Sequence, residues 1–314
     1  MVTASRDSSP PNDNDRPSCF GFAVSSTCDF RFLRRGGGAD RLEVVEADGQ
    51  LSAPDSTLLL EWTVRDPTAD ITARLYGVDG IYHFWTTDAG WYRIDPAARR
   101  IEISDHKDEI RREHRLWGVP TALCAKQRGD FVLHGAAVEV DGGAILMAAP
   151  GRFGKSTLAL AFHRQGYRIL TEDTACCALR PGPVLYPGPT SIRLRPDMFD
   201  GQAPAGTTIV DVRRDRIHLV VDSQRTGGGG PVPIRMVVFL RESSDEIRLE
   251  RVQSGRALPD LWTLGLRFQT EAERRQSFTQ FASLAASVPV YNLHRRLTVA
   301  DLDDVVSRLI EAAS

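Results

Sequence analysis

Apolar and polar residues alternate in short stretches along the first third of the chain, which is the pattern of β-strands that bury one face. Strands are therefore predicted at residues 42–46, 58–64, 81–86, 91–94 and 100–104. Asp88-Ala89-Gly90 separates two of these strands and is typical of a hairpin turn. Trp62, Trp85 and Trp91 lie on the predicted strands. We expect them in the core of a small sheet, the alternative being a substrate groove.

The pattern changes after residue 105, where helical and strand periods follow one another. Helices are predicted at 108–116 and 120–127, before a strand at 131–140. Asp141-Gly142 then predicts a tight hairpin into an apolar strand at 143–148. A helix at 156–165, stopped by Gly166, leads to a short strand at 167–170.

The rest of the chain continues this mixture. Further strands are predicted at 176–179, 184–186, 191–195, 209–212, 217–221, 233–240 and 288–293. A helix is expected at 271–286, and a last helix begins at Thr298 with a capping box to Asp301. The glycines at 227–230 predict a flexible loop, with an active-site lid as the alternative.

These patterns predict an α/β (α+β) protein in three parts. Residues 1–18 are rich in Ser, Pro, Asn and Asp and are expected to form a disordered tail. Residues 19–105 are expected to form a small β-rich domain, and residues 106–314 a second domain with a mixed sheet.

Composition narrows the class of protein. The 314 residues are 42% hydrophobic and 25% charged, with a net charge of −2, as in a soluble globular protein without an electrostatic case for nucleic acid. There is no apolar run of about 20 residues for a membrane span, and the N-terminus does not read as a signal peptide. Five cysteines without C-x-x-C spacing favour reduced thiols over disulfides or zinc, so we expect a cytoplasmic protein.

One stretch carries recognisable chemistry, because it fits the phosphate-loop pattern G-x-x-x-x-G-K-[ST] with Ala in place of the first Gly. It consists of Ala149, Pro150, Gly151, Arg152, Phe153, Gly154, Lys155, Ser156 and Thr157. The two glycines let successive N–H groups point at phosphate oxygens. Lys155 supplies a cation to the β- and γ-phosphates, and Ser156 offers a hydroxyl to Mg²⁺. The alternative is a glycine loop before an ordinary helix, but the flanking strand and helix favour nucleotide binding.

Acidic residues follow at the place where phosphoryl transfer needs them. A right-handed crossover makes the strand at 167–170 parallel to the loop strand and brings Glu172 and Asp173 beside the phosphates. There they suit a Mg²⁺ ligand and a general base. The alternative is two exposed acids in a turn. His134 would lie on the hairpin strand next to the loop, where a lone histidine is usually structural.

Taken together, residues 128–138, the Asp141-Gly142 turn, the phosphate loop and residues 166–173 resemble the catalytic domain of HPr kinase/phosphorylase. The resemblance is closer to its stand-alone relatives in bacterial biosynthetic clusters, such as lasso-peptide tailoring kinases. It is strongest over residues 120–195 and weak before residue 105. It implies the fold of the phosphoenolpyruvate carboxykinase nucleotide domain, which agrees with an antiparallel hairpin before the loop.

The resemblance also implies roles for matching residues. His134 matches an active-site histidine, and Lys155 and Ser156 match the phosphate and Mg²⁺ groups. Glu172 matches the acid that acts as base and Asp173 the acid that binds metal, although the regulator kinases have Asp in both places. A downstream signature for recognising HPr is missing. Arg193, Arg195, Arg214 and Arg216 are candidates for further phosphate contacts, with surface charge as the alternative for each.

The sequence therefore predicts an ATP- and Mg²⁺-dependent kinase that phosphorylates a hydroxyl of a peptide or small natural product, as a biosynthetic tailoring step. The alternatives are a nucleotide-dependent binding or regulatory module, an HPr-type serine kinase and, more weakly, a carboxykinase-like enzyme. Neither nucleic acid nor membrane is expected as a partner. A homo-oligomer is left open.

Overall fold

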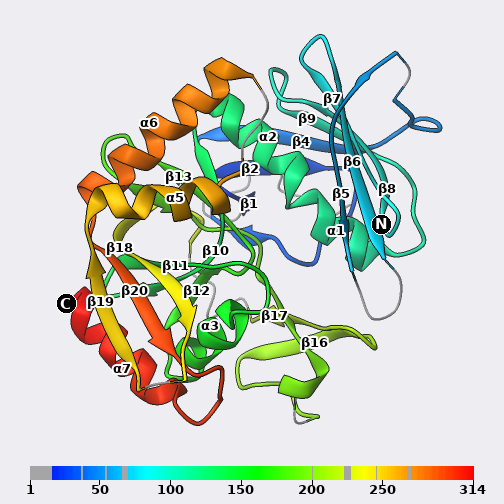
Figure 1. The fold of residues 1–314 in the computed structure, drawn as a ribbon. Coiled ribbons are helices and arrows are strands. Elements are labelled where there is room, and N and C mark those ends of the chain that lie inside the picture. Colours follow the sequence, from blue (N-terminus) through cyan, green and yellow to red (C-terminus); the bar gives the residue numbers. More distant parts are fainter. Residues whose placement is uncertain are drawn as a thin grey trace, which may run out of the picture.

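The computed structural model describes residues 16–36, 38–53, 55–65, 70–199, 201–222, 228–244, 246–266 and 270–314. It is a mixed α/β structure with three sheets (Figure 1). Residues 1–15, most of the predicted tail, lie outside the described residues. The tail was predicted to extend to residue 18, and this is wrong at its end, because Pro17 and Ser18 belong to a strand and Ser18 is buried.

All strands of the N-terminal part form one nine-stranded sheet in the order β3-β1-β2-β4-β9-β8-β7-β6-β5. Its strands are β1 (Pro17–Cys19), β2 (Phe22–Ser26), β3 (Arg34–Arg35), β4 (Asp40–Glu46), β5 (Thr57–Val64), β6 (Ile71–Val78), β7 (Ile81–Thr86), β8 (Gly90–Asp95) and β9 (Arg100–Ile103). Alternate residues of the central strands enter one core, which they share with helices α1 (Glu109–Leu116) and α2 (Val119–Arg128). The described N-terminal strands and the two helices therefore pack as one unit.

The three tryptophans are not in that core, contrary to the expectation. Phe84 and Tyr92 face inward, while Trp85 and Trp91 are half-buried and Trp62 is 36% exposed. For Trp85 and Trp91, strand alternation explains the difference, because a residue next to an inward-facing one points to the other side of the sheet. Trp62 is paired with the buried Ala73 and so lies on the inner face, but β5 is the last strand of the sheet and leaves part of its side chain exposed. Strand β6 was missed by the sequence analysis.

The second half of the chain forms an eight-stranded sheet and a small three-stranded sheet. The larger contains β10 (Phe131–Val140), β11 (Gly143–Ala148), β12 (Arg168–Thr171), β13 (Thr174–Ala178), β14 (Val184–Tyr186), β18 (Val232–Glu242), β19 (Arg248–Val252) and β20 (Val290–Arg295). The smaller contains β15 (Ser191–Leu194), β16 (Thr207–Val212) and β17 (Ile217–Val221). The helices are α3 (Lys155–Arg164), α5 (Ser254–Leu264), α6 (Glu271–Ser287) and α7 (Leu302–Ala313), with a 3₁₀ turn η2 at Pro196–Met198.

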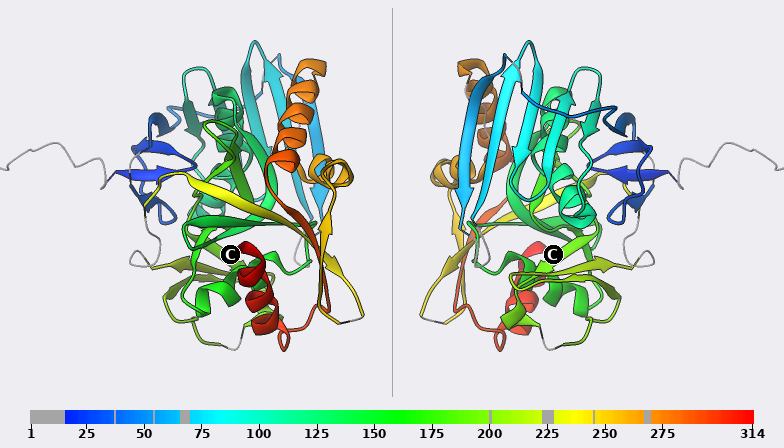
Figure 2. Two further views of the ribbon diagram at one scale, coloured as in Figure 1. Left: turned by 90° about the vertical axis from the view of Figure 1, so that its left-hand side faces the viewer. Right: turned by 90° about the vertical axis from the view of Figure 1, so that its right-hand side faces the viewer.

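Helices cover both faces of the larger sheet, with α5 and α6 above it and α3 and α7 below it (Figures 1 and 2). Strand β11 shows why this arrangement is stable. Ile145 and Met147 pack toward α3 and α7, and Leu146 and Ala148 pack toward α5 and α6. Because both faces are buried, the strand is apolar throughout. Among the helices of the described residues, none has the length and apolar character that a membrane span needs.

The predicted hairpin before the phosphate loop is confirmed. Strands β10 and β11 pair antiparallel, with Asp141 and Gly142 in the left-handed conformation at φ 48° and 74°. Strand β12 pairs antiparallel with β10, so it runs in the direction of β11 with β10 between them. The parallel neighbour of β11 is β18. The sheet is therefore mixed, as expected.

One prediction near the C-terminus needs correction. The last helix begins at Leu302 with Asp301 as its N-cap, not at Thr298. Thr298 instead donates its hydroxyl hydrogen bond to the Asp301 carboxylate at 3.1 Å, within the turn before the helix. Of the glycine tract at 227–230, Gly227 lies outside the described residues. Gly229 lies against Ser18 and Gly36. The described glycines line neither cavity discussed below, so they offer no support for a lid.

Candidate functional site

The predicted phosphate loop joins the end of β11 to the start of α3, so the expected order of strand, loop and helix is present. Arg152 and Gly154 both have left-handed backbones, at φ 74° and 79°, which turn the chain sharply into the helix. Ala149, which departs from the usual pattern, is 1% exposed and packs into the core below the sheet. Its φ is not among the positive values, so this loop does not require glycine there.

Lys155 is held inside the loop by three hydrogen bonds. Its ammonium group donates to the Ala149 carbonyl at 2.7 Å, to the Pro150 carbonyl at 2.9 Å and to Nε2 of His134 at 3.0 Å. An ammonium group has three donors, so all three are used. Burial lowers the pKa of Lys155 from its ordinary value. Binding of a phosphate would therefore exchange these partners for an anion.

The contact with Lys155 determines the tautomer of His134. An ammonium group can only donate, so Nε2 must be the acceptor and the ring proton lies on Nδ1. Nδ1 can then donate to the Asp173 carbonyl at 3.1 Å. Burial is the main cause of the lowered pKa of His134, and the cationic Lys155 and Arg193 add to it. His134 is a neutral donor and acceptor between the loop and the acidic pair.

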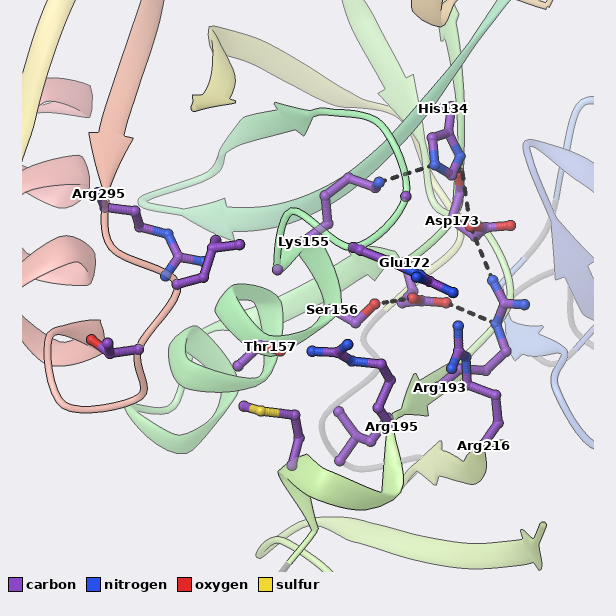
Figure 3. A pocket seen from close by; sticks show the side chains of 17 residues that line it. His134, Lys155, Ser156, Thr157, Glu172, Asp173, Arg193, Arg195, Arg216 and Arg295 are labelled. Carbon is purple, nitrogen blue, oxygen red and sulfur yellow. Dashed lines mark hydrogen bonds and ion pairs between the residues drawn. The ribbon is translucent and has the colours of Figure 1, made fainter. Parts of the chain in front are cut away.

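Glu172 contacts the serine of the loop. Ser156 donates its hydroxyl to Oε1 of Glu172, and Nε of Arg193 lies 3.4 Å from Oε2 (Figure 3). The carboxyl is 5% exposed, and burial raises its pKa against the opposing effect of Arg193. Glu172 therefore lies where a metal ion on Ser156 would be bound.

Asp173 has different surroundings from Glu172. Its carboxylate lies 3.0 Å from a guanidinium nitrogen of Arg193 and 3.6 Å from Nδ1 of His134, with 38% of the side chain exposed. Burial alone would raise its pKa, but Arg193 and then His134 hold the pKa well below its ordinary value. Asp173 is therefore an ionised carboxylate.

These groups surround a cavity of about 150 Å³, which is lined by six basic and two acidic side chains. The basic residues are Arg152, Lys155, Arg193, Arg195, Arg216 and Arg295, and the acidic residues are Glu172 and Asp173. Figure 3 shows Lys155 at the loop, Arg193 on the three-stranded sheet, Arg295 at the end of β20 and the acidic pair between β12 and β13. Such an excess of cations suits a polyanionic ligand.

The predicted residues are mostly brought together in this cavity. Gly151, Gly154, Ser156 and Thr157 line it with Lys155, whereas Ala149, Pro150 and Phe153 do not. Arg193, Arg195 and Arg216 line it, but Arg214 is exposed and lies outside its lining.

A metal ion would have a limited set of protein ligands here. Among the described residues, no three His, Cys, Asp or Glu side chains come together as a metal cage. Mg²⁺, however, is commonly held by one or two carboxylates together with substrate phosphates and water. A serine hydroxyl with a neighbouring carboxylate, as in Ser156 and Glu172, fits that requirement. The five cysteines form no disulfide, as expected.

A second cavity, of about 310 Å³, lies on the other side of the acidic pair. His134 and Asp173 line both cavities. Its remaining walls come from β5 to β7, the first two helices, β10, the start of β13 and the end of α5.

No protein-family model and no curated protein matches this chain. Among solved structures, the HPr(Ser) kinase/phosphatase from Coxiella burnetii is similar with a TM-score of 0.31 and 9% identity, over 58% of this chain and 99% of that chain. A likeness this loose does not establish a shared fold, so functional interpretation depends on the residues of the site.

Two residues near the site were missed by the sequence analysis. Arg295, at the end of β20, is 2% exposed and its guanidinium touches Gly154 closely enough that a Cβ on that glycine would clash. Its Nε has no hydrogen-bond acceptor among the described residues. His114 of α1 lines the second cavity, and its ring lies 6.3 Å from that of His218. Neither belongs to a local motif, so only the long-range packing identifies them.

Proposed function

We propose that the protein is an ATP- and Mg²⁺-dependent kinase that transfers the γ-phosphoryl group to a hydroxyl of a peptide or small molecule. The observation that carries this proposal is the direct contact between the phosphate loop and the acidic pair, made by Ser156 and Glu172 in a cavity rich in cations. Phosphoryl transfer needs phosphate-binding groups, a metal site and a carboxylate near the attacking hydroxyl, and the three are adjacent here.

The phosphate loop and the arginines near it bind the phosphoryl donor. Backbone N–H groups of the loop and the start of α3 bind phosphate oxygens, and Lys155 turns from the Ala149 and Pro150 carbonyls to the β- and γ-phosphates. Ser156 and Glu172 would hold Mg²⁺, which would supply positive charge to the transferring group. Arg193 and Arg295 add cations on two sides of the cavity.

The contacts support Asp173 as the base, with Glu172 on the metal side. This reverses the order that the family resemblance implies. Glu172 is bonded to Ser156 and is outside the lining of the second cavity, whereas Asp173 lines both cavities and is ionised. A base must first be within reach of the hydroxyl, and geometry precedes pKa in that choice. His134 is close enough to orient Asp173.

The test is transfer of label from γ-labelled ATP to hydroxyl acceptors, including candidate precursor peptides. We expect Asp173→Asn to lose about 100- to 1,000-fold in transfer with ATP affinity unchanged, because only the base is removed. Glu172→Gln should instead raise the Mg²⁺ concentration needed for half-maximal rate, because it weakens the metal site. The reverse result, in which Glu172→Gln loses transfer and Asp173→Asn needs more Mg²⁺, would identify Glu172 as the base.

The second class of function is a nucleotide-dependent binding or regulatory module. Wild-type protein that binds or hydrolyses ATP but labels no acceptor would contradict the kinase proposal and support this module. Transfer to HPr alone would support an HPr-type serine kinase. A role in natural-product tailoring and a cytoplasmic location remain predictions from the sequence.

A further inference from the structure

The second cavity is bounded by two parts of the chain that are far apart in sequence. Trp62, Ile71 and Phe84 contribute from the N-terminal sheet, and Leu133 and Leu264 contribute from the other half. A volume of about 310 Å³ is at the lower end of small-molecule sites, which run from about 300 to 1,000 Å³. It can hold one aromatic or branched aliphatic group.

The polar groups of this cavity lie where it adjoins the first cavity, which the phosphate loop lines. His134 of β10 is paired with Thr174 of β13, Asp173 directly precedes Thr174, and His114 of α1 lines the same cavity. Arg115 also lines the cavity, but Asp88 holds its guanidinium at 2.8 Å and matches its charge. The other described lining residues are apolar or glycine. The cavity therefore suits a neutral, apolar group with a polar end.

The apolar wall extends to the surface on β5, the last strand of its sheet. Trp62 is 36% exposed and Val64 is 51% exposed, although both line the cavity. The Trp62 ring stacks on Phe84 with centroids 5.9 Å apart and an interplanar angle of 21°. Trp62 and Val64 thus form an exposed apolar mouth that is continuous with the cavity, as in a ligand-binding groove.

The nucleotide base has another place to bind. Leu194, Met198 and Leu297 line the first cavity, the one beside the phosphate loop, which is called the phosphate cavity below. Leu297 is two residues after Arg295, and Figure 3 shows Arg295 and His134 on opposite sides of Lys155. A base packed against these residues would leave the cavity beside His134 to the other substrate.

We infer that this cavity is the acceptor site and that the acceptor carries an aromatic or branched aliphatic group next to its hydroxyl. The inference rests on the proposed function and adds its substrate class. The acceptor hydroxyl gives its proton to the Asp173 carboxylate while its oxygen forms a bond to the γ-phosphorus. The bond from that phosphorus to the β,γ-bridging oxygen breaks, and ADP leaves with the electron pair.

Binding is measured first, by saturation-transfer NMR with two apolar probes and their polar counterparts. The small-molecule pair is 2-phenylethanol and 2-methoxyethanol, and the peptide pair is N-acetyl-seryl-phenylalanine amide and N-acetyl-seryl-glycine amide. We expect each apolar probe to bind about ten-fold or more tightly than its counterpart, because its ring leaves water. If the small-molecule pair shows the larger preference for its apolar member, the acceptor is a small molecule. If the peptide pair does, the acceptor is a peptide.

Matched variants locate the binding. Trp62→Ala should weaken the apolar probes about ten-fold. Trp85→Ala removes a tryptophan of the same sheet outside the cavity lining and should leave them unchanged. Val64→Glu puts a charge at an exposed position of the mouth and is a second test that does not disturb the core. Equal effects of the two tryptophan variants, or displacement of the probes by ATP, would overturn the inference.

Transfer from γ-labelled ATP then separates this inference from the kinase proposal. Labelling of the apolar acceptors about ten-fold faster than the polar ones, lost in Trp62→Ala, supports both. Equal labelling of the two series overturns the apolar acceptor site and leaves the kinase standing. Binding of ATP without labelling of any acceptor overturns both.

Discussion

The two cavities share His134 and Asp173 but are opposite in character. The phosphate cavity is lined by six basic side chains and suits an anion, whereas the second cavity is lined mainly by apolar side chains, with Arg115 and Asp173 as its charged residues. One suits the part of the reaction common to all phosphoryl donors, and the other suits the part that distinguishes acceptors. Substitutions that remove charge from the first cavity should therefore leave binding in the second cavity unchanged. Substitutions that change the shape of the second cavity should leave binding in the first unchanged.

The largest effect is expected at Lys155 in the phosphate cavity. Lys155→Met removes the cation that the loop presents to the phosphates, and we expect kcat/KM for transfer to fall about 1,000-fold or more. Probe binding in the second cavity should be unchanged, which NMR titration would check. Lys107→Met, at an exposed lysine, is the control. A loss of probe binding in Lys155→Met would mean that the two cavities are not independent.

The next effect is on stability and depends on pH. His218 is 5% exposed beside Arg193, and burial followed by that charge lowers its pKa from 6.5 to about 4. Between these values the unfolded chain binds a proton that the folded chain does not, so stability falls as the pH falls through this window. The expected loss for this group is about 3 kcal/mol.

Urea unfolding at several pH values tests this expectation. His218→Asn should flatten the fall in unfolding free energy between pH 6.5 and 4, and His106→Asn should keep the wild-type slope. An unchanged slope in His218→Asn would show that protonation of this histidine does not oppose folding. It would also weaken the description of the phosphate cavity as a concentration of buried positive charge.

A smaller effect is expected at Arg295. Arg295→Met should weaken ATP binding about ten-fold, because a hydrogen bond to a charged group contributes about 1.5–3 kcal/mol. Calorimetric titration measures it, with Arg296→Met, at the exposed neighbouring residue, as the control. Equal affinities in the two variants would remove Arg295 from the phosphate site.

The smallest effect is expected at Ala149, where the loop departs from the usual pattern. Ala149→Gly should change ATP affinity less than two-fold, and destabilise the protein by about 0.5–1 kcal/mol through the entropy of the unfolded chain. Thermal unfolding and nucleotide titration measure the two quantities. Tighter ATP binding in the glycine variant would show that the alanine side chain distorts the loop.

Local patterns made some elements predictable and concealed others. The β10–β11 hairpin was found because Asp141-Gly142 takes the left-handed conformations that a two-residue turn needs. Helix α5 was missed because Gly255 and Pro259 lie inside it. Packing of Ala257 and Leu261 into the core stabilises this helix against its weak local preference.

The phosphate-loop motif and the order of strand, loop, helix and acidic pair could be predicted from the sequence, because each depends on neighbours along the chain. The distant side chains that complete the site could be identified only from the way the chain folds. Arg193 and Arg214 look alike in sequence, yet β15 turns the first into the phosphate cavity and the second is exposed. Trp62 lies on a strand like Trp85, but only Trp62 lines the cavity beside Asp173. Such choices depend on how sheets and helices pack, and packing is set by contacts between residues far apart in the chain.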